Sequence, residues 1–120
     1  MVTNPVFCHT PNAILVRDDE GVYAIDREDL IKYSGRSGLI ASGVIMRLLT
    51  EAFHDLSPNE VPHRDSIRVL SAFPGQGVRD GIEFITRAVT KGRFILDTNA
   101  GSEMAAPSPI GGRMYFEVAI

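Results

Sequence analysis

The stretch that most constrains the fold spans residues 39–56 and reads LIASGVIMRLLTEAFHDL. Apolar residues recur in it at helical spacing and cover nearly the whole circumference of the predicted helix: Leu39, Ile40, Val44, Ile45, Leu48, Leu49 and Phe53. A helix that is apolar on most sides is buried on several sides. The small residues Ala41, Ser42 and Gly43 would let another element approach closely. The rest of the chain must therefore pack around this helix.

The segment before this helix predicts a β-hairpin. Residues 13–26 read AILVR, DDEG and VYAID, which is the pattern of two short strands around an acidic turn closed by Gly21. Asp26 then precedes the helix-like run REDLIKY, with Asp29 three residues on, as in a capping box. The sequence SGRSG at 34–38 marks a break before the long helix.

The second half of the chain predicts three strands and another helix. Strands are indicated by IRVLSAF (67–73), RFILD (93–97) and MYFEVAI (114–120). A helix is indicated at 78–92, with Gly92 placed to end it and an apolar face made of Val78, Ile82, Ile85 and Val89. Prolines make 57–65 a turn-rich linker, and small residues make 98–113 a loop.

These elements predict an α+β fold, a two-layer α/β sandwich. We expect a mixed sheet of about five strands packed against two main helices, with an N-terminal β-hairpin. At 120 residues the chain is expected to form a single domain, 1–120, that can bury its own core.

Composition narrows the class of protein. Hydrophobic residues make up 44% and charged residues 22%, which indicates a globular chain and not a disordered one. The net charge of -3 disfavours nucleic acid and anionic membranes as partners. The lone cysteine, Cys8, precludes an internal disulfide and is expected to be a buried apolar residue. No signal peptide or membrane-spanning run is recognisable, so we expect a soluble, cytoplasmic protein.

Two glycine-rich turns lie before predicted helix starts. The first candidate, FPGQGVRDG at 73–81, follows a predicted strand. The backbone amides of residues 77–79 would be unpaired donors with partial positive charge, and Arg79 adds a full charge nearby, so an anionic or carbonyl oxygen fits there. The alternative is a plain glycine turn in which Asp80 helps to cap the helix.

The second candidate turn is SGRSG at 34–38. Arg36 is the only charged residue between 33 and 46, and its guanidinium suits a carboxylate or phosphate. The alternative is an arginine that pairs with an acid on a neighbouring helix. If both turns open at the same end of the sheet, Arg36 and Arg79 converge with two helix starts. The predicted ligand-binding residues are Ser34, Gly35, Arg36, Ser37, Gly75, Gln76, Gly77, Arg79 and Asp80.

Other chemistry finds less support in the sequence. Gly75, Gly77 and Asp97 imitate a dinucleotide-binding unit, but the spacing departs from the known pattern and too few strands and helices remain to complete that fold. The histidines His9, His54 and His63 lack metal-ligand spacing. We therefore predict no metal site and no catalytic residue, and the sequence leaves both the cofactor and enzymatic activity open.

With these turns located, the chain resembles the formylmethanofuran dehydrogenase E-like family. The similarity covers residues 33–96, in the stretches YSGRSGLIASGVIMR (33–47) and SAFPGQGVRDGIEFITRAVTKGRFIL (71–96). Asp80, Ile82, Thr86 and Gly92 agree with the family's second motif. Ser34 and Arg36 stand where the family has histidines, and the family's cysteines have no counterpart. The resemblance thus implies the family's scaffold without its metal or redox chemistry.

Three functions are consistent with these observations. The first is a small-molecule-binding domain, or a divergent enzyme, with a polar pocket between the two turns. The second is a non-catalytic homo-oligomer or partner-binding protein, supported by the apolar 39–56 helix and by the final strand, which offers an edge for pairing. The third is a nucleotide-binding module. We expect a small polar or anionic partner and a homo-oligomer.

Overall fold

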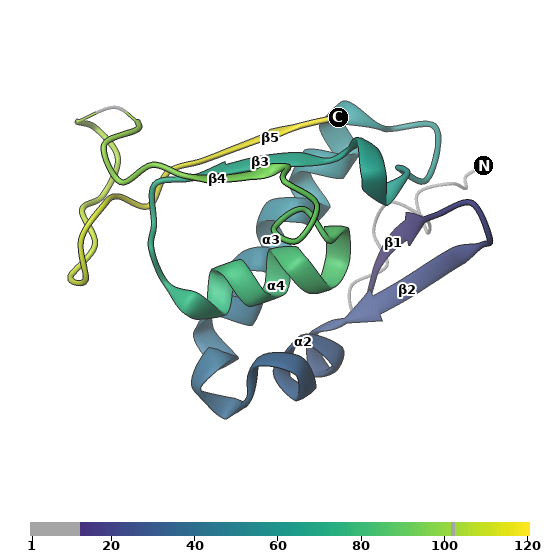
Figure 1. Cartoon of the computed structure of the whole chain (residues 1–120), viewed down its shortest axis with the longest axis horizontal. Helices are drawn as coiled ribbons and strands as arrows, with labels where there is room; N and C mark the ends of the chain where they lie inside the picture. The colour runs from purple at the N-terminus through teal and green to yellow at the C-terminus, as the bar shows by residue number, and fades with distance from the viewer. Residues whose placement is uncertain (1–12, 102) are drawn as a thin grey trace.

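The computed structural model describes residues 13–101 and 103–120. A three-stranded sheet lies above α3 and α4, α2 lies below them, and the hairpin projects to one side (Figure 1). The elements in chain order are β1 (Ala13–Arg17), β2 (Val22–Asp26), α2 (Arg27–Ser34), the 3₁₀ turn η1 (Arg36–Gly38), α3 (Leu39–Leu56), the 3₁₀ turn η2 (Arg64–Ser66), β3 (Arg68–Ser71), α4 (Gln76–Thr86), β4 (Phe94–Leu96) and β5 (Phe116–Ala119). The predicted α+β class and N-terminal hairpin are confirmed. No helix within the described ranges is long and apolar enough to cross a membrane.

The predicted strands form two small sheets and not one sheet of about five strands. β1 pairs only with β2, antiparallel. The other sheet has the order β4-β3-β5, with β3 parallel to β4 and antiparallel to β5, so it is mixed as expected. The linker segment around Pro62 explains the division. Arg17 donates its backbone N–H to the Pro62 carbonyl at 3.0 Å and bridges to His63, so this segment occupies the position beside β1 that another strand would take.

The hairpin and the start of α2 form through the local signals seen in the sequence. Asp18 accepts hydrogen bonds from the backbone N–H groups of Glu20 and Gly21, at 2.8 and 3.1 Å, which closes the acidic turn. Asp26 accepts from the N–H of Asp29 at 2.9 Å, and the Asp29 carboxylate accepts from the N–H of Asp26 at 3.1 Å. This reciprocal pair is the predicted capping box.

Helix α3 has the predicted bounds, and one long face of it is buried. Ile45 and Leu49 have no exposed surface and Phe53 keeps 8%. The expectation of burial was wrong at the first turn, where Leu39 is 40% and Ile40 84% exposed. At that end α4 approaches Gly38 and Ala41, so the adjacent apolar side chains are left facing outward.

Helix α4 ends at Thr86, well before the predicted end at Gly92. Arg87 adopts the left-handed conformation, with φ of 59°, and stops the helix. Two arginines from elsewhere then bind the carbonyls that the helix leaves unpaired. Arg64 donates to the Phe84 carbonyl at 2.8 Å, and Arg93 donates to the Thr86 carbonyl at 2.9 Å. Cations at a helix end also interact favourably with its partial negative charge.

The core lies between α3, α4, the hairpin and one face of the three-stranded sheet. Its α4 side is the predicted face, with Val78, Ile82 and Ile85 essentially inaccessible to solvent. Val89, which was expected on the same face, lies beyond the helix and is only half-buried. β3 contributes Val69, which is 2% exposed.

Missing side chains let α3 and α4 pack closely. A Cβ atom added at Gly77 would lie 2.7 Å from the Cβ of Ala41 and 3.4 Å from the Cα of Gly38. One added at Gly81 would lie 3.2 Å from side-chain atoms of Ile45. Gly77 and Gly81 are one helical turn apart and therefore share the face of α4 that contacts α3.

This contact predicts that Gly77→Ala destabilises the protein although alanine is the better helix former. Crowding against Ala41 should cost about 1–3 kcal/mol in the free energy of unfolding, which exceeds the gain of up to about 1 kcal/mol from helix propensity. Urea denaturation followed by circular dichroism measures the difference.

The matched control is Gly43→Ala in α3. A Cβ added there lies 3.4 Å from the guanidinium of Arg27, which is an ordinary van der Waals distance, so the substitution should be neutral or stabilising by up to about 1 kcal/mol. Equal effects of the two substitutions would contradict the packing role of Gly77.

Candidate functional site

The two glycine-rich turns singled out in the sequence lie side by side. The contact between Gly77 and Gly38 brings the start of α4 against η1 and the first turn of α3. The two turns thus approach each other through their backbones, whereas the convergence of Arg36 and Arg79 stays a hypothesis. The same contact shows that Gly77 is required for helix packing, whatever else the turn binds.

Neither α3 nor α4 begins with a side-chain cap. The N-cap residues are Gly38 and Gly75, and the first turns of both helices contain no acidic residue. Helix α2 differs, because it has a capping box and Glu28 and Asp29 in its first turn. The first hydrogen bond within α4 runs from the Arg79 N–H to the Gly75 carbonyl, at 3.3 Å. The N–H groups of residues 76–78 therefore have no acceptor within the helix. These N–H groups give the start of α4 a partial positive charge.

The start of α3 is continuous with η1, which uses part of its amides. Gly38 donates its N–H to the Gly35 carbonyl at 3.0 Å, and Leu39 donates to the Arg36 carbonyl. The amides of Arg36 and Ser37 therefore begin this composite helix. Gly35 has a φ of 85°, a conformation that favours glycine.

Of the polar side chains in the SGRSG turn (34–38), one is hydrogen-bonded and two are exposed. Ser34 donates its hydroxyl to the Leu30 carbonyl at 2.9 Å and lies against Gly38. Arg36 and Ser37 are exposed. Within residues 13–101 and 103–120, Arg36 forms no ion pair, so the alternative in which it pairs with a helix acid is not seen there.

In the FPGQGVRDG turn (73–81) more of the side chains contact other residues. The Gln76 side-chain amide donates to the Asp80 carboxylate at 2.8 Å, so Asp80 does not cap the start of α4. Arg79 is exposed and its guanidinium lies 5.9 Å from the centre of the Phe94 ring. Gly75 lies beneath the ring of Phe73, which leaves no room for a side chain.

Asp97, the acid of the nucleotide-binding alternative, follows β4 at the sheet edge. Its carboxylate accepts from the N–H of Asn99 at 3.0 Å, and its own N–H donates to the Ser71 carbonyl at 2.9 Å. β3, α4 and β4 form a single βαβ unit in a sheet of three strands. A dinucleotide-binding half needs more such units.

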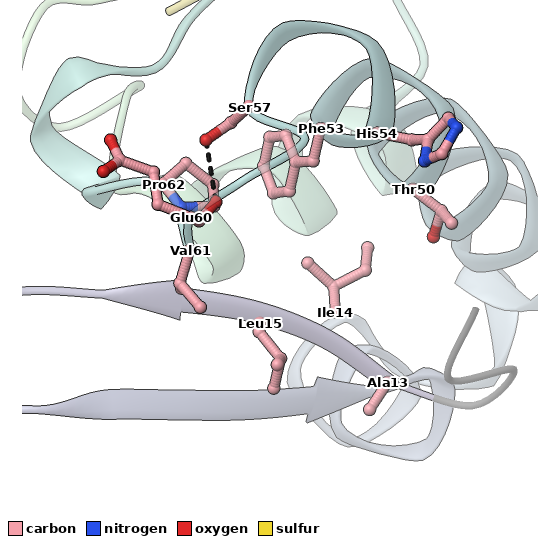
Figure 2. Close-up of a pocket in the computed structure, with 10 residues that line it drawn as sticks. All are labelled: Ala13, Ile14, Leu15, Thr50, Phe53, His54, Ser57, Glu60, Val61 and Pro62. Carbon is pink, nitrogen blue, oxygen red and sulfur yellow. Dashed lines mark hydrogen bonds between the residues drawn. The ribbon is translucent and has the colours of Figure 1, made fainter. Parts of the chain in front are cut away.

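A small pocket opens between β1, the end of α3 and the following linker (Figure 2). Ile14 and Phe53 point toward its interior, and the Ser57 hydroxyl donates to the Glu60 carbonyl at 2.8 Å on its rim. Its volume of about 50 Å³ is far below the roughly 300–1,000 Å³ of typical ligand pockets. This pocket is too small for a metabolite.

A larger open groove, which sequence analysis missed, runs between β2, α2 and the end of α4. We name it the Tyr23–Phe84 groove; its volume is about 600 Å³. The rings of Tyr33 and Phe84 lie 5.2 Å apart, and the Arg64 guanidinium lies 5.6 Å from the centre of the Tyr23 ring. The only sequence signal was the presence of aromatic residues in separate elements, which no spacing rule connects.

Glu83 lies in this groove and is held by Thr90. Its carboxylate accepts from the Thr90 backbone N–H at 2.9 Å and from the Thr90 hydroxyl. Partial burial raises the pKa of Glu83, but the two hydrogen bonds from Thr90 and the nearby charge of Arg87 outweigh burial and hold the pKa below its ordinary value.

Cys8 and His9 lie outside the described residues. Within the described residues no cluster of three or more potential metal ligands occurs.

Thr90→Val should raise the pKa of Glu83 toward its ordinary value, because it removes the hydroxyl donor and keeps the backbone donor. An NMR titration of the Glu83 carboxyl against pH measures this change. A lowered pKa contributes stability above the unfolded-state pKa, and that stability is lost as the pH falls through the folded-state pKa. The stability difference between wild type and Thr90→Val should therefore vanish in acid. Thr98→Val, in an exposed loop, is the control and should not move the Glu83 titration.

Comparison with known proteins identifies no relative. No family model matches the chain, and neither a curated protein nor a solved structure does so. The resemblance over residues 33–96 therefore stays a prediction.

Proposed function

We propose that this protein binds a small anionic molecule at the junction of η1, α3 and α4. The contact between Gly38 and Gly77 is the observation that carries the proposal, because it places two helix starts without side-chain caps next to each other. Backbone amides at helix starts are donors to anions, and adjacent starts reinforce each other.

The side chains around the junction support an anion and not a cation. Arg36 and Arg79 belong to the two turns and are exposed, and neither forms an ion pair within the described parts of the chain. A guanidinium binds carboxylate and phosphate groups through paired N–H donors. The nearest acid in these turns, Asp80, already accepts the Gln76 amide.

The ligand class follows from these donors. We infer a phosphorylated metabolite or a small carboxylic acid, held by amides of residues 36–37 and 76–78 and by the two arginines. The proposed site residues are those predicted from the two turns: Ser34, Gly35, Arg36, Ser37, Gly75, Gln76, Gly77, Arg79 and Asp80. Ser34 and Gly77 serve chiefly to shape it. We assign no catalytic residue, because the only carboxylate in the set is engaged.

The proposal agrees with the resemblance to the formylmethanofuran dehydrogenase E-like family. Ser34 and Arg36 occupy the histidine positions of that family's motif. A serine and an arginine offer hydrogen-bond donors where histidines would offer metal ligands. Anion binding would then replace metal chemistry on a related scaffold.

A thermal-shift screen tests the proposal. The panel holds inorganic phosphate, nucleotides, phosphorylated sugars, small carboxylic acids and pterins at matched ionic strength. A ligand present at a hundred times its dissociation constant stabilises the folded state by about 2.7 kcal/mol, which raises the melting temperature measurably. We expect at least one phosphate or carboxylate compound to stabilise the wild type, and to do so less in Arg36→Ala and in Arg79→Ala.

Arg47→Ala is the matched control. Arg47 is an exposed arginine on α3 that pairs with Glu51 at 3.8 Å, so its loss changes the net charge equally without touching the junction. A stabilising compound whose effect is unchanged in both turn variants but lost in Tyr33→Ala would place the site in the Tyr23–Phe84 groove and refute the proposal. A panel without any stabilising compound would also count against it.

A further inference from the structure

β5 presents an unpaired edge of the three-stranded sheet. It lies beyond β3 on the side opposite β4, at the top of the molecule in Figure 1. The bond from the Ala72 N–H to the Tyr115 carbonyl, 2.9 Å long, sets the phase of the β3–β5 ladder. Because hydrogen-bonded and non-hydrogen-bonded pairs alternate, Glu117 and Ala119 direct their backbone groups at β3, whereas Phe116 and Val118 direct theirs away from it.

The outward backbone groups of this edge have no partner in the part of the chain that the structure describes. Neither Phe116 nor Val118 forms a hydrogen bond apart from the β3 ladder. Natural edge strands are commonly protected by proline, lysine or a bulge. β5 reads FEVA and contains no proline, lysine or bulge; its protective features are its length of four residues and the charge of Glu117. Such an edge is ready to accept another strand.

The two faces of β5 differ in character. Phe116 and Val118 are partly buried against the core beneath the sheet. Glu117 and Ala119 are exposed on the opposite face, where Ala119 pairs with Arg68 of β3. Ile120, which follows the strand, is 46% exposed.

We propose that a second copy of this chain pairs with β5 through its own β5, antiparallel and across a twofold axis at Val118. The two three-stranded sheets then join into one continuous sheet. In this register Val118 lies opposite the partner's Val118, Phe116 opposite the partner's Ile120, and Glu117 opposite the partner's Ala119. The outward N–H and C=O groups of Val118 are satisfied, and apolar side chains meet on the core side.

Charge complementarity selects this register. Arg68, Ala119 and the partner's Glu117 fall in one row across the sheet. Strands are spaced about 4.8 Å apart, so the arginine and the partner's carboxylate stand roughly 10 Å apart at their Cα atoms. Both side chains are long, and the alanine between them is small, so the two charges can meet above it. The twofold axis creates this pair twice.

Within the described residues, neither Arg68 nor Glu117 forms an ion pair that would compete with this contact. Arg68 is exposed and forms no ion pair there, and Glu117 accepts a hydrogen bond only from the Tyr115 hydroxyl, at 2.5 Å. Centring the axis on Glu117 instead would set two like charges directly opposite each other, which is destabilising. The register centred on Val118 avoids this repulsion.

The other exposed edge with a comparable length is less suitable for two copies. Antiparallel pairing of β2 with itself about Ala24 would set Val22 opposite the partner's Asp26, whose backbone N–H is already bound by the Asp29 carboxylate at 3.1 Å. β4 has only three residues. The chemistry of the edges therefore favours β5.

Val118→Pro tests the proposal sharply. Proline removes an N–H that points away from β3, so the internal ladder keeps its bonds while the outer edge is blocked. Sedimentation velocity of the full chain over a concentration series should show a reversible dimer for the wild type. The dimer dissociation constant of Val118→Pro should rise about tenfold or more, since two backbone hydrogen bonds of about 0.5–1.5 kcal/mol each are lost.

Leu96→Pro is the matched control, because alternation along the parallel ladder also points the Leu96 N–H away from β3, at the opposite edge. It should leave the dimer intact, and circular dichroism should show that both proline variants are folded. A wild type that stays monomeric up to its solubility limit, or equal weakening by the two prolines, overturns the proposal.

Charge exchange tests the register separately. Arg68→Glu and Glu117→Arg should each weaken the homodimer, because each sets like charges together twice. Mixed in equal amounts, the two variants should form a heterodimer, since every facing pair is then opposite in charge. A mixture that associates no better than the separate variants overturns the proposed register.

Discussion

The close approach of α3 and α4 is the constraint on which the rest of the structure depends. It is possible because Gly77 and Gly81 offer no side chains to Ala41 and Ile45. Helix α4 is joined on either side to β3 and β4, so its position on α3 fixes the sheet. Helix α3 in turn contacts the hairpin through β1 and the sheet through β5. One backbone-to-backbone contact therefore sets the positions of both sheets and of the candidate site.

The two ends of α4 differ in whether side chains bind their unpaired backbone groups. Its start lacks a side-chain cap, whereas at its end Arg64 and Arg93 bind the carbonyls of residues 84–86. Arg93 also donates to the carbonyls of Arg64 and Ile67, and its side chain is 13% exposed. Arginine side chains thus satisfy the carbonyls at the negative end of the helix, whereas no side chain caps the N–H groups at its positive end. This asymmetry is the electrostatic basis of the proposed anion site.

The parts of the fold that were predicted correctly are those with local causes. The Asp18 turn, the capping box of Asp26 and the limits of α3 each depend on residues a few positions apart. The end of α4 was mispredicted because it depends on an arginine from η2 and on Arg93, which precedes β4. The division into two sheets was missed for the same reason, since Pro62 blocks β1 from a distant part of the chain.

The candidate site shows the same division between local and distant causes. The glycine turns were recognisable in the sequence, but the packing role of Gly77 required the position of Ala41. The Tyr23–Phe84 groove was invisible because its aromatic residues come from three elements. Side chains that contact each other across elements leave no spacing pattern for a single sequence to show.

The position of β5 in the chain has a consequence for synthesis. β3 can pair with β4 once residue 97 has emerged, but its other side waits for residues 116–119. At about 5–20 residues per second, the roughly twenty intervening residues take on the order of one to four seconds to make. During that interval the central strand of the final sheet is itself an edge strand, open to pairing with other nascent chains. The long connection between β4 and β5 therefore exposes one side of β3 during synthesis, whereas in the finished sheet β5 covers that side of β3.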